Sequence, residues 1–352
     1  MTGVQERYQS WTMRSLAIGG RGTKISSARS PRASIERLQM AQDDYHTPVL
    51  EREIVELFAR LSAGVVLDAT LGGAGHAQAI LAAGPQLRLL GVDRDADARV
   101  VALTRLEAFG DRVRVVDATF AEMSRVVESN ADFVGGEDVV GVLMDLGVSS
   151  HQLDESSRGF SFRTDAPLDM RMDATRGETA AEFLARVDLH ELVRLLRANG
   201  ESRFAGAIAR LIFERQPQTT WELTEAVERA VPMAARRRGH VAARAFQALR
   251  IAVNQEEEQL ERGLGAAVAL LVPGGVLAVI SYHSGEDRVV KSVLHEAATG
   301  GCHCPVELGC VCGAVSLVRV AKASAQLASP AEVALNPRAR SARLRVAWKL
   351  AQ

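Results

Sequence analysis

Residues 68–76 carry the first pattern that could do chemistry, because they read Asp-Ala-Thr-Leu-Gly-Gly-Ala-Gly-His between an apolar β-branched run and a helix-forming stretch. Glycines at such a point let the backbone approach a ligand closely, and a helix N-terminus offers unpaired N–H groups to an anionic group. A tight turn has a similar composition, so this loop alone is a weak signal. Asp93 lies at the offset of about 20 residues at which a carboxylate accepts the hydroxyls of an adenosine ribose. The two features together predict an adenosine-containing ligand.

The order of residues in this loop distinguishes two classes of such ligands. A dinucleotide site needs G-x-G-x-x-G directly after the strand to seat a pyrophosphate. Here the order is Asp-x-Thr-x-Gly-x-x-Gly, which places an acid at the strand end, where it suits an amino acid moiety better than a pyrophosphate. The loop therefore favours S-adenosylmethionine as the ligand.

The elements that must position these residues alternate in the first half of the chain. Apolar runs predict strands over 65–67, 87–92, 113–116 and 139–144, and helical spacing predicts helices over 50–61, 76–83 and 96–109. Such alternation is typical of a parallel, doubly wound α/β sheet. Residues 154–258 have helical patterns without a convincing strand, and strands resume over 276–281 and 344–348. We therefore predict a Rossmann-like sheet with an inserted helical domain.

Composition narrows the class of protein. Of the 352 residues, 47% are hydrophobic and 24% are charged, and the net charge is −1, so any affinity for nucleic acid must come from local basic patches. The sequence has no apolar run of about 18 residues for a membrane span, and its start lacks the pattern of a secretory signal. Residues 1–42 are expected to be a disordered extension, or else residues upstream of the true start. The protein is expected in the cytoplasm.

Several longer motifs occur in order along the chain. They are His-Thr-Pro-Val-Leu at 46–50, Gly-Val-Asp-Arg-Asp at 91–95, Leu-Gly-Val-Ser-Ser at 146–150, Arg-Gly-Phe-Ser-Phe at 158–162, Pro-Leu-Asp-Met-Arg-Met-Asp at 167–173, Phe-Gln-Ala-Leu-Arg-Ile at 246–251 and Asn-Pro-Arg-Ala-Arg-Ser at 336–341. With the glycine-rich loop, they resemble the ribosomal RNA small subunit methyltransferase H family over residues 45–352. The resemblance implies a class I methyltransferase domain at 43–153 and 259–352, with a substrate-recognition insert at 154–258. It also implies methylation of N4 of a cytosine in the decoding region of 16S ribosomal RNA, so this RNA or the small ribosomal subunit is the expected partner.

The resemblance assigns the contacts with the methyl donor by position, and these fall on Ala74, Gly75, His76, Asp93, Phe120, Asp145 and Gln152. Two of them also have a physical argument. An aromatic ring after the third strand, Phe120, can pack on adenine, although an ordinary core phenylalanine is an equal alternative. Asp145 ends the fourth strand beside the switch in strand order, where doubly wound sheets bind ligands.

Methyl transfer to a cytosine amine needs a free lone pair, but this amino group is conjugated with its ring. Acceptors placed on its N–H groups would localise the lone pair and align it with the methyl carbon. We predict that Asp145 and the backbone carbonyls of Leu146 and Gly147 are those acceptors. Many amino methyltransferases have Asp/Ser-Pro-Pro-Tyr here, whereas this chain has Asp-Leu-Gly-Val, so an aromatic clamp must come from elsewhere.

Candidates for that clamp are Phe160, Phe162 and the pair Tyr282–His283. The family pattern near the pair is Ser-Phe-His-Ser-Leu-Glu-Asp-Arg, and residues 281–288 read Ser-Tyr-His-Ser-Gly-Glu-Asp-Arg, so Gly285 replaces a leucine. Because His283 keeps its place in this motif, the resemblance makes it a candidate catalytic residue. The alternatives are ordinary packing for the two phenylalanines and a hydrogen-bonded structural role for His283.

Arginines are the candidates for RNA contacts, namely Arg171, Arg244 and Arg250. On a helix, Arg244, Gln247 and Arg250 share one face, which suits phosphate contacts. A merely solvated face is the alternative, and positions 241 and 243 depart from the proline and threonine usual in the family.

The cysteines lie within one short segment, as Cys302, Cys304, Cys310 and Cys312. Structural zinc, adventitious metal and free thiols all stay open, because C-x-C pairs are tighter than the usual spacing of zinc ligands. A rival activity, methylation of cytosine C5, would need a cysteine thiolate, and no cysteine precedes residue 302. A second rival is an RNA-binding assembly factor with a vestigial donor site, which the intact Asp93 and Asp145 disfavour.

Overall fold

The computed structural model describes residues 48–136, 138–147, 155–236, 241–305, 311–321 and 324–351. The extension predicted for residues 1–42 lies outside these ranges. Among the described residues, no helix combines the length and apolar character that a membrane span requires.

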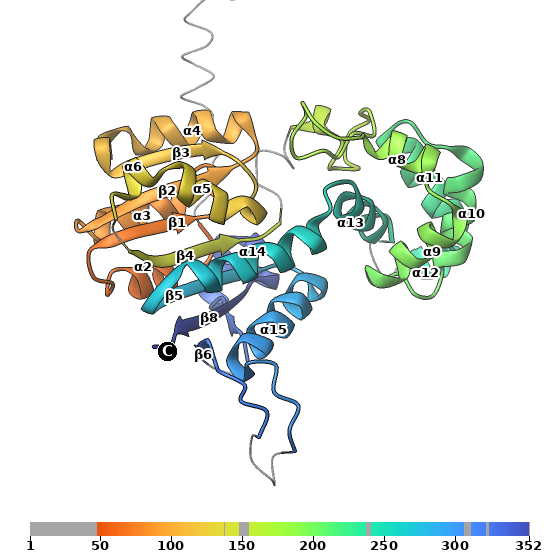
Figure 1. The fold of residues 1–352 in the computed structure, drawn as a ribbon. Coiled ribbons are helices and arrows are strands. Elements are labelled where there is room, and N and C mark those ends of the chain that lie inside the picture. The colour runs from red at the N-terminus through yellow and green to blue at the C-terminus, as the bar shows by residue number, and fades with distance from the viewer. Residues whose placement is uncertain are drawn as a thin grey trace, which may run out of the picture. The chain divides into compact units, whose positions relative to one another are not determined.

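The strands of the described residues form a sheet in the order β3-β2-β1-β4-β5-β8-β6 (Figure 1). Strand β7 pairs with β8. The strands of the sheet are β1 (Gly64–Asp68), β2 (Leu87–Asp93), β3 (Val113–Asp117), β4 (Val139–Asp145), β5 (Leu271–Ser281), β6 (Val318–Val320), β7 (Gln326–Leu327) and β8 (Arg343–Lys349). The strands from β3 to β5 are parallel, whereas β8 is antiparallel to β5 and β6. This topology confirms the predicted doubly wound α/β sheet, and its order reverses between β1 and β4.

Helices cover both faces of the sheet because neighbouring strand residues point to opposite sides. In β1, Val65 and Leu67 belong to one apolar cluster and Val66 to the other. The Val66 cluster contains side chains of α2 (Glu51–Phe58), α3 (Gly75–Ala83) and α4 (Ala96–Leu106). The other contains side chains of α5 (Met123–Ser129), α6 (Ala131–Val134), α14 (Glu256–Leu270) and α15 (Ser284–Thr299).

Several boundaries differ from the prediction, among them the end of α2, which lies at Phe58 and not at residue 61. Two of the differences involve neighbouring segments. The helix predicted to reach residue 109 ends as α4 at Leu106 and continues as the 3-10 segment η1 (Glu107–Arg112), in which Gly110 has φ 53° and ψ −128°. Strand β5 begins at Leu271, before the predicted residue 276, because a register shift against β4 absorbs the Pro-Gly-Gly turn. Local spacing could not predict either feature, since each depends on a neighbouring segment.

In the described part of the chain between β4 and α14, helices form and no strand occurs, as the periodicity predicted. They are α8 (Ala180–Arg186), α9 (Leu189–Ala198), α10 (Ala205–Arg215), α11 (Thr220–Ala230), α12 (Met233–Arg236) and α13 (Val241–Val253). Thr179, Asp188 and Thr219 cap the N-termini of α8, α9 and α11 with their side-chain oxygens. A third apolar cluster, distinct from the two on the sheet, unites all of these helices except α12. The domain boundary at residues 154 and 258 stays a prediction.

Four short elements remain, and one of them, α16, contacts the start of the described chain. They are η2 (Phe120–Glu122), η3 (Ser156–Arg158), α16 (Pro330–Leu335) and η5 (Pro337–Ser341). The backbone N–H of Leu50 donates a hydrogen bond of 2.6 Å to Oε1 of Glu332 in α16. Asp287 in α15 binds Arg343 and Arg345 of β8. These contacts hold the antiparallel end of the sheet against the helices beside it.

Candidate functional site

A cavity of about 450 Å³ lies where the carboxyl ends of β1, β2 and β4 meet. This is the switch point of the sheet, at which ligands of doubly wound folds bind. Its lining includes eight of the predicted site residues and one predicted RNA contact: Gly75, His76, Asp93, Phe120, Asp145, Leu146, Gly147, His283 and Arg250. The tertiary structure thus brings residues from distant parts of the chain to one site.

The glycine-rich loop has the backbone geometry that its composition predicts. Ala74, the N-cap of α3, is in the left-handed region with φ 61°, and Gly72 has φ 49°. A side chain at Gly75 would meet Pro48, since its Cβ would lie 2.6 Å from the proline Cγ. Ala74 itself is fully buried and does not line the cavity. It therefore shapes the loop from beneath.

Asp93 ties this loop to β2. Its Oδ2 accepts a hydrogen bond of 2.8 Å from the backbone N–H of Gly72, and its Oδ1 accepts one of 2.8 Å from the N–H of Asp95. Burial raises the pKa of the Asp93 carboxyl, and these two N–H groups oppose the rise. The sequence predicted a ribose contact here but missed the link between the loop and the strand.

Asp145 is held from three sides. Its backbone N–H donates to Oγ1 of Thr70 at 2.5 Å, its Oδ1 accepts a hydrogen bond of 2.8 Å from the phenol of Tyr282, and its Oδ2 lies 3.6 Å from Nδ1 of His76. Burial raises the pKa of the Asp145 carboxyl, whereas His76 and the Tyr282 hydroxyl lower it. Burial and the nearby Asp145 charge raise the pKa of Tyr282, so its phenol stays protonated and donates.

His76 presents one defined nitrogen to Asp145. Its Nε2 lies 2.8 Å from the backbone carbonyl oxygen of Val49, and a carbonyl only accepts, so Nε2 carries the hydrogen. In the neutral ring, Nδ1 is then an acceptor that faces the carboxylate.

Asp68 is a titratable group that the sequence interpretation used only as part of the loop. It is 2% exposed, and its Oδ1 accepts a hydrogen bond of 3.2 Å from the N–H of Thr70. Burial, more than any other cause, raises the pKa of its carboxyl to about 7. An acid at the end of an apolar strand was the available signal.

His283 forms the N-cap of α15. Its Nδ1 accepts from the N–H of Glu286 at 3.3 Å, while Oε2 of Glu286 accepts from the N–H of Tyr282 at 2.8 Å. A Cβ at position 285 would lie 3.0 Å from Nδ1 of His283, so the glycine found there leaves the ring more room than the leucine of the family would. The ring lines the cavity, and its catalytic role stays a prediction.

Arg250 and Arg244 are paired with carboxylates. Arg250 binds Glu256 through two hydrogen bonds of 2.8 and 2.9 Å, and its side chain is only 14% exposed. Arg244 binds the buried Glu201 at 2.7 Å. The predicted shared face of α13 is therefore not simply solvated. Arg250 faces the cavity, and a role of either residue in RNA contact stays a prediction.

The other candidate substrate contacts do not line this cavity. Phe160 is buried in the apolar cluster of the helical insert. The ring of Phe162 packs edge-to-face on that of Phe246, with the ring centroids 5.6 Å apart. Arg171 binds Asp169 through two hydrogen bonds of 2.8 Å and lines a neighbouring cavity of about 190 Å³. Their roles as substrate contacts remain predictions, and Gln152 lies outside the described residues.

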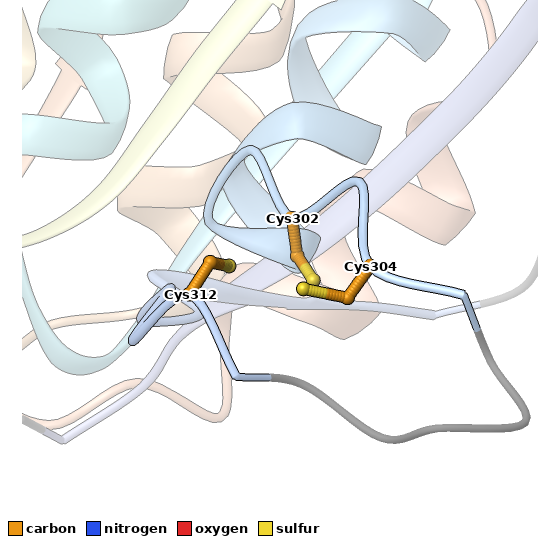
Figure 2. A group of neighbouring side chains, drawn as sticks. All are labelled: Cys302, Cys304 and Cys312. Atoms are coloured by element: carbon orange, nitrogen blue, oxygen red, sulfur yellow. The ribbon is translucent and has the colours of Figure 1, made fainter.

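Three cysteines converge on the segment between α15 and β6 (Figure 2). The Sγ atoms of Cys302, Cys304 and Cys312 all lie within 4.8 Å of one another. The N–H of Val311, the thiols of Cys312 and Cys302 and the N–H of Cys312 lower the pKa of Cys304. Cys310 lies outside the described residues.

The cavity fits S-adenosylmethionine. Its volume of about 450 Å³ lies within the range of roughly 300–1,000 Å³ that is usual for small-molecule sites. A carboxylate at the end of β2, an aromatic ring at Phe120 and the start of α3 stand around it. These groups match a ribose, an adenine and an amino acid carboxylate respectively.

Known proteins match this chain over a range that includes the residues around the cavity. The model of the MraW methylase family matches residues 43–350. Ribosomal RNA small subunit methyltransferase H of Geobacter sp. (strain M21) is 46% identical over 88% of this chain and 100% of its own length. The protein of the same name from Geobacter sulfurreducens is 48% identical over 87% of this chain and 99% of its own length. A solved rRNA methylase from Streptococcus thermophilus aligns at 12% identity with a TM-score of 0.37 over 93% of this chain and 100% of that chain, which adds nothing to the topology above.

Proposed function

The chain belongs to the MraW methylase family, and we propose that it transfers a methyl group from S-adenosylmethionine to the N4 amine of a cytosine in the decoding region of 16S ribosomal RNA. One observation above all supports an amine as the methyl acceptor. Tyr282 holds the Asp145 carboxylate, a hydrogen-bond acceptor, in the wall of the cavity. When bound, S-adenosylmethionine supplies an electrophilic methyl group on a sulfonium. The residues of the chain must place the amine against it.

The proposed donor contacts follow from unused bonding capacity around the loop. Each oxygen of Asp93 accepts one backbone N–H and keeps a second lone pair for a ribose hydroxyl. Phe120 lines the cavity, where its ring can pack on adenine. Gly75 and His76 begin α3, and their N–H groups suit a carboxylate. The donor is thereby oriented between β1 and β2.

Asp145 acts on the amine in this proposal. Tyr282 fixes Oδ1, so a cytosine N–H that donates to this carboxylate is held in one orientation, with its lone pair turned toward the methyl group. As the new C–N bond forms and the S–C bond breaks, the nitrogen acquires positive charge and must lose a proton. Burial makes the Asp145 carboxylate a better proton acceptor than an exposed one. His76 Nδ1, 3.6 Å from Oδ2, is the next acceptor in line.

The backbone of Leu146 and Gly147 continues the cavity wall beyond Asp145. Gly147 has φ 94°, a conformation that favours glycine. We propose that the two carbonyls assist Asp145 as acceptors. Their role can be separated from that of the side chain because a side-chain substitution leaves them in place.

The RNA is proposed to enter from the side of the helical insert. Arg250 lines the cavity together with Met172, and Arg244, Arg171 and Phe162 are the further candidates on the insert. Since 16S ribosomal RNA or the small subunit is the proposed partner, the proposed location is the cytoplasm.

The two rival functions are less well supported. Cytosine C5 methylation needs a thiolate at the base, and no cysteine of the described residues lines the cavity. An assembly factor with a vestigial donor site would not need the Asp93 and Asp145 contacts that the fold maintains.

The direct test is to map methylation in 16S ribosomal RNA from cells with and without the gene, and to restore it with the purified protein. We expect loss of one N4-methylcytosine mark and its return when protein and S-adenosylmethionine are added to unmodified small subunits or RNA. A methyl group on carbon, or an unchanged set of marks, would contradict the proposal. Binding of S-adenosylhomocysteine without any transfer would favour the assembly factor.

A further inference from the structure

The cysteine cluster, which comprises Cys302, Cys304 and Cys312, lies on two arms of one loop (Figure 2). The loop leaves α15 and returns beside it, since the N–H of Leu317 donates to the carbonyl of Ala297 at 2.8 Å. A Cβ at Gly300 would lie 2.5 Å from the carbonyl oxygen of Val315, so the two arms also touch there. The backbone thus holds the thiols together from both sides.

We propose that the cysteine cluster binds one zinc ion through its three thiolates. Zinc with sulfur ligands at about 2.3 Å in a tetrahedron places sulfurs roughly 3.8 Å apart. The three Sγ atoms, all within 4.8 Å of one another, need to move only slightly to reach that geometry. Three thiolates leave one position on the ion for a further ligand.

The partial exposure of these three side chains argues against a purely apolar role. A free cysteine without a chemical role usually behaves as a small buried hydrophobe. Here Cys312 is exposed, Cys302 and Cys304 are only partly buried, and none of them belongs to the three apolar clusters of the fold. Convergence of three thiols that are at least partly exposed is instead what a surface metal site requires.

The expected effect of the ion is to close the loop between α15 and β6. The cysteine cluster does not line the donor cavity. Binding free energy of a structural zinc ion contributes to folding, because the unfolded chain does not hold the ligands in place. The site should therefore stabilise the protein and leave methyl transfer nearly unchanged, whether or not the proposed substrate is correct.

The test measures zinc in the full chain purified under reducing conditions, by elemental analysis and by release to a colorimetric chelator. We expect about one zinc per chain in the natural protein, and less than a tenth of that in Cys302→Ser/Cys304→Ser and in Cys312→Ser. Val311→Ser is the matched control, because Val311 is 86% exposed on the same loop and supplies no ligand. It should bind zinc like the natural protein.

Two further measurements do not depend on how well the cysteine variants fold. Removal of zinc from the natural protein should lower Tm, and zinc addition should restore it. Cobalt substitution should give the intense visible absorption of a tetrahedral thiolate site. Zinc content that is equal in the natural protein and the cysteine variants, or a Cys302–Cys304 disulfide found in the freshly purified protein by mass spectrometry, would overturn the proposal.

Discussion

The phenol of Tyr282 donates a hydrogen bond of 2.8 Å to Oδ1 of Asp145, although 137 positions separate the two residues along the chain. Tyr282 directly follows β5, and Asp145 ends β4, so the parallel pairing of these strands brings the two side chains together. A carboxylate that is oriented in this way presents its remaining lone pairs in fixed directions.

Asp145→Asn should lower the single-turnover rate of methyl transfer by about 10²-fold or more while the fold is kept, since loss of one preorganised group typically costs about 3 kcal/mol. Asn has nearly the same shape, but its amide presents donors to an amine that needs acceptors. Single-turnover rates at several donor concentrations measure the effect. If the rate recovers fully at high donor concentration, Asp145 only binds the donor and has no role in the chemical step.

Tyr282→Phe should shift the acid limb of the pH–rate profile to higher pH. The Tyr282 hydroxyl lowers the pKa of Asp145, so its removal lets burial raise that pKa further. The ionised carboxylate is then lost at a higher pH when the solution is acidified. Single-turnover rates across the pH range for the natural protein and the variant test this. A uniform fall in rate with an unchanged acid limb would mean that the phenol acts by packing alone.

Asp68→Asn should make stability less dependent on pH. In the folded chain the pKa of Asp68 is about 7 against 3.8 for the usual carboxyl, so between these values the folded state holds a proton that the unfolded state has lost. Asp68 therefore adds to the free energy of unfolding below pH 3.8. This contribution, on the order of 4 kcal/mol in total, is lost as the pH rises to about 7.

Urea unfolding between about pH 4 and pH 8 gives the free energy of unfolding of the natural protein and of Asp68→Asn. The difference between the two isolates the effect of Asp68, since Asp93 and Asp145 are present in both proteins. We expect the natural protein to lose stability relative to Asp68→Asn as the pH rises through this range. Parallel curves for the two proteins would show that Asp68 is ionised in the folded state.

Asp93→Ala should weaken binding of S-adenosylhomocysteine by about 1.5–3 kcal/mol, the range for a hydrogen bond to a charged group. Removal of the carboxylate also releases the N–H of Gly72, which loosens the loop. Calorimetry with S-adenosylhomocysteine compares Asp93→Ala with Asp117→Ala as the matched control. Asp117 ends the neighbouring β3, and its side chain binds Arg99 and does not line the donor cavity. Equal affinity in the Asp93 variant and the control would place the ligand away from β2.

Much of the fold and part of the site could be predicted from the sequence because their signals are local. Alternating strands and helices appear as period-2 and period-3.6 patterns, and the glycine-rich loop with Asp93 appears as spacing along one strand, turn and helix. Both follow from the conformations open to a few neighbouring residues. The close spacing of the cysteines is also a local signal in the sequence. Only the structure shows that the thiols of three of them converge from both arms of a loop, which is the basis for proposing a metal site.

The tertiary structure decided which distant groups meet. Spacing could not reveal that Tyr282 donates to Asp145, that Glu256 pairs with the cavity-facing Arg250, or that Phe160 is buried in the insert. These contacts depend on the order of strands in the sheet and on how the insert returns to it through α13 and α14. Strand order and long-range packing minimise exposed apolar surface over the whole chain, and no short stretch of sequence carries that information. The sequence alone therefore determined the kind of ligand and the alternation of elements, and the folded chain determined the protonation and orientation of the groups that act on it.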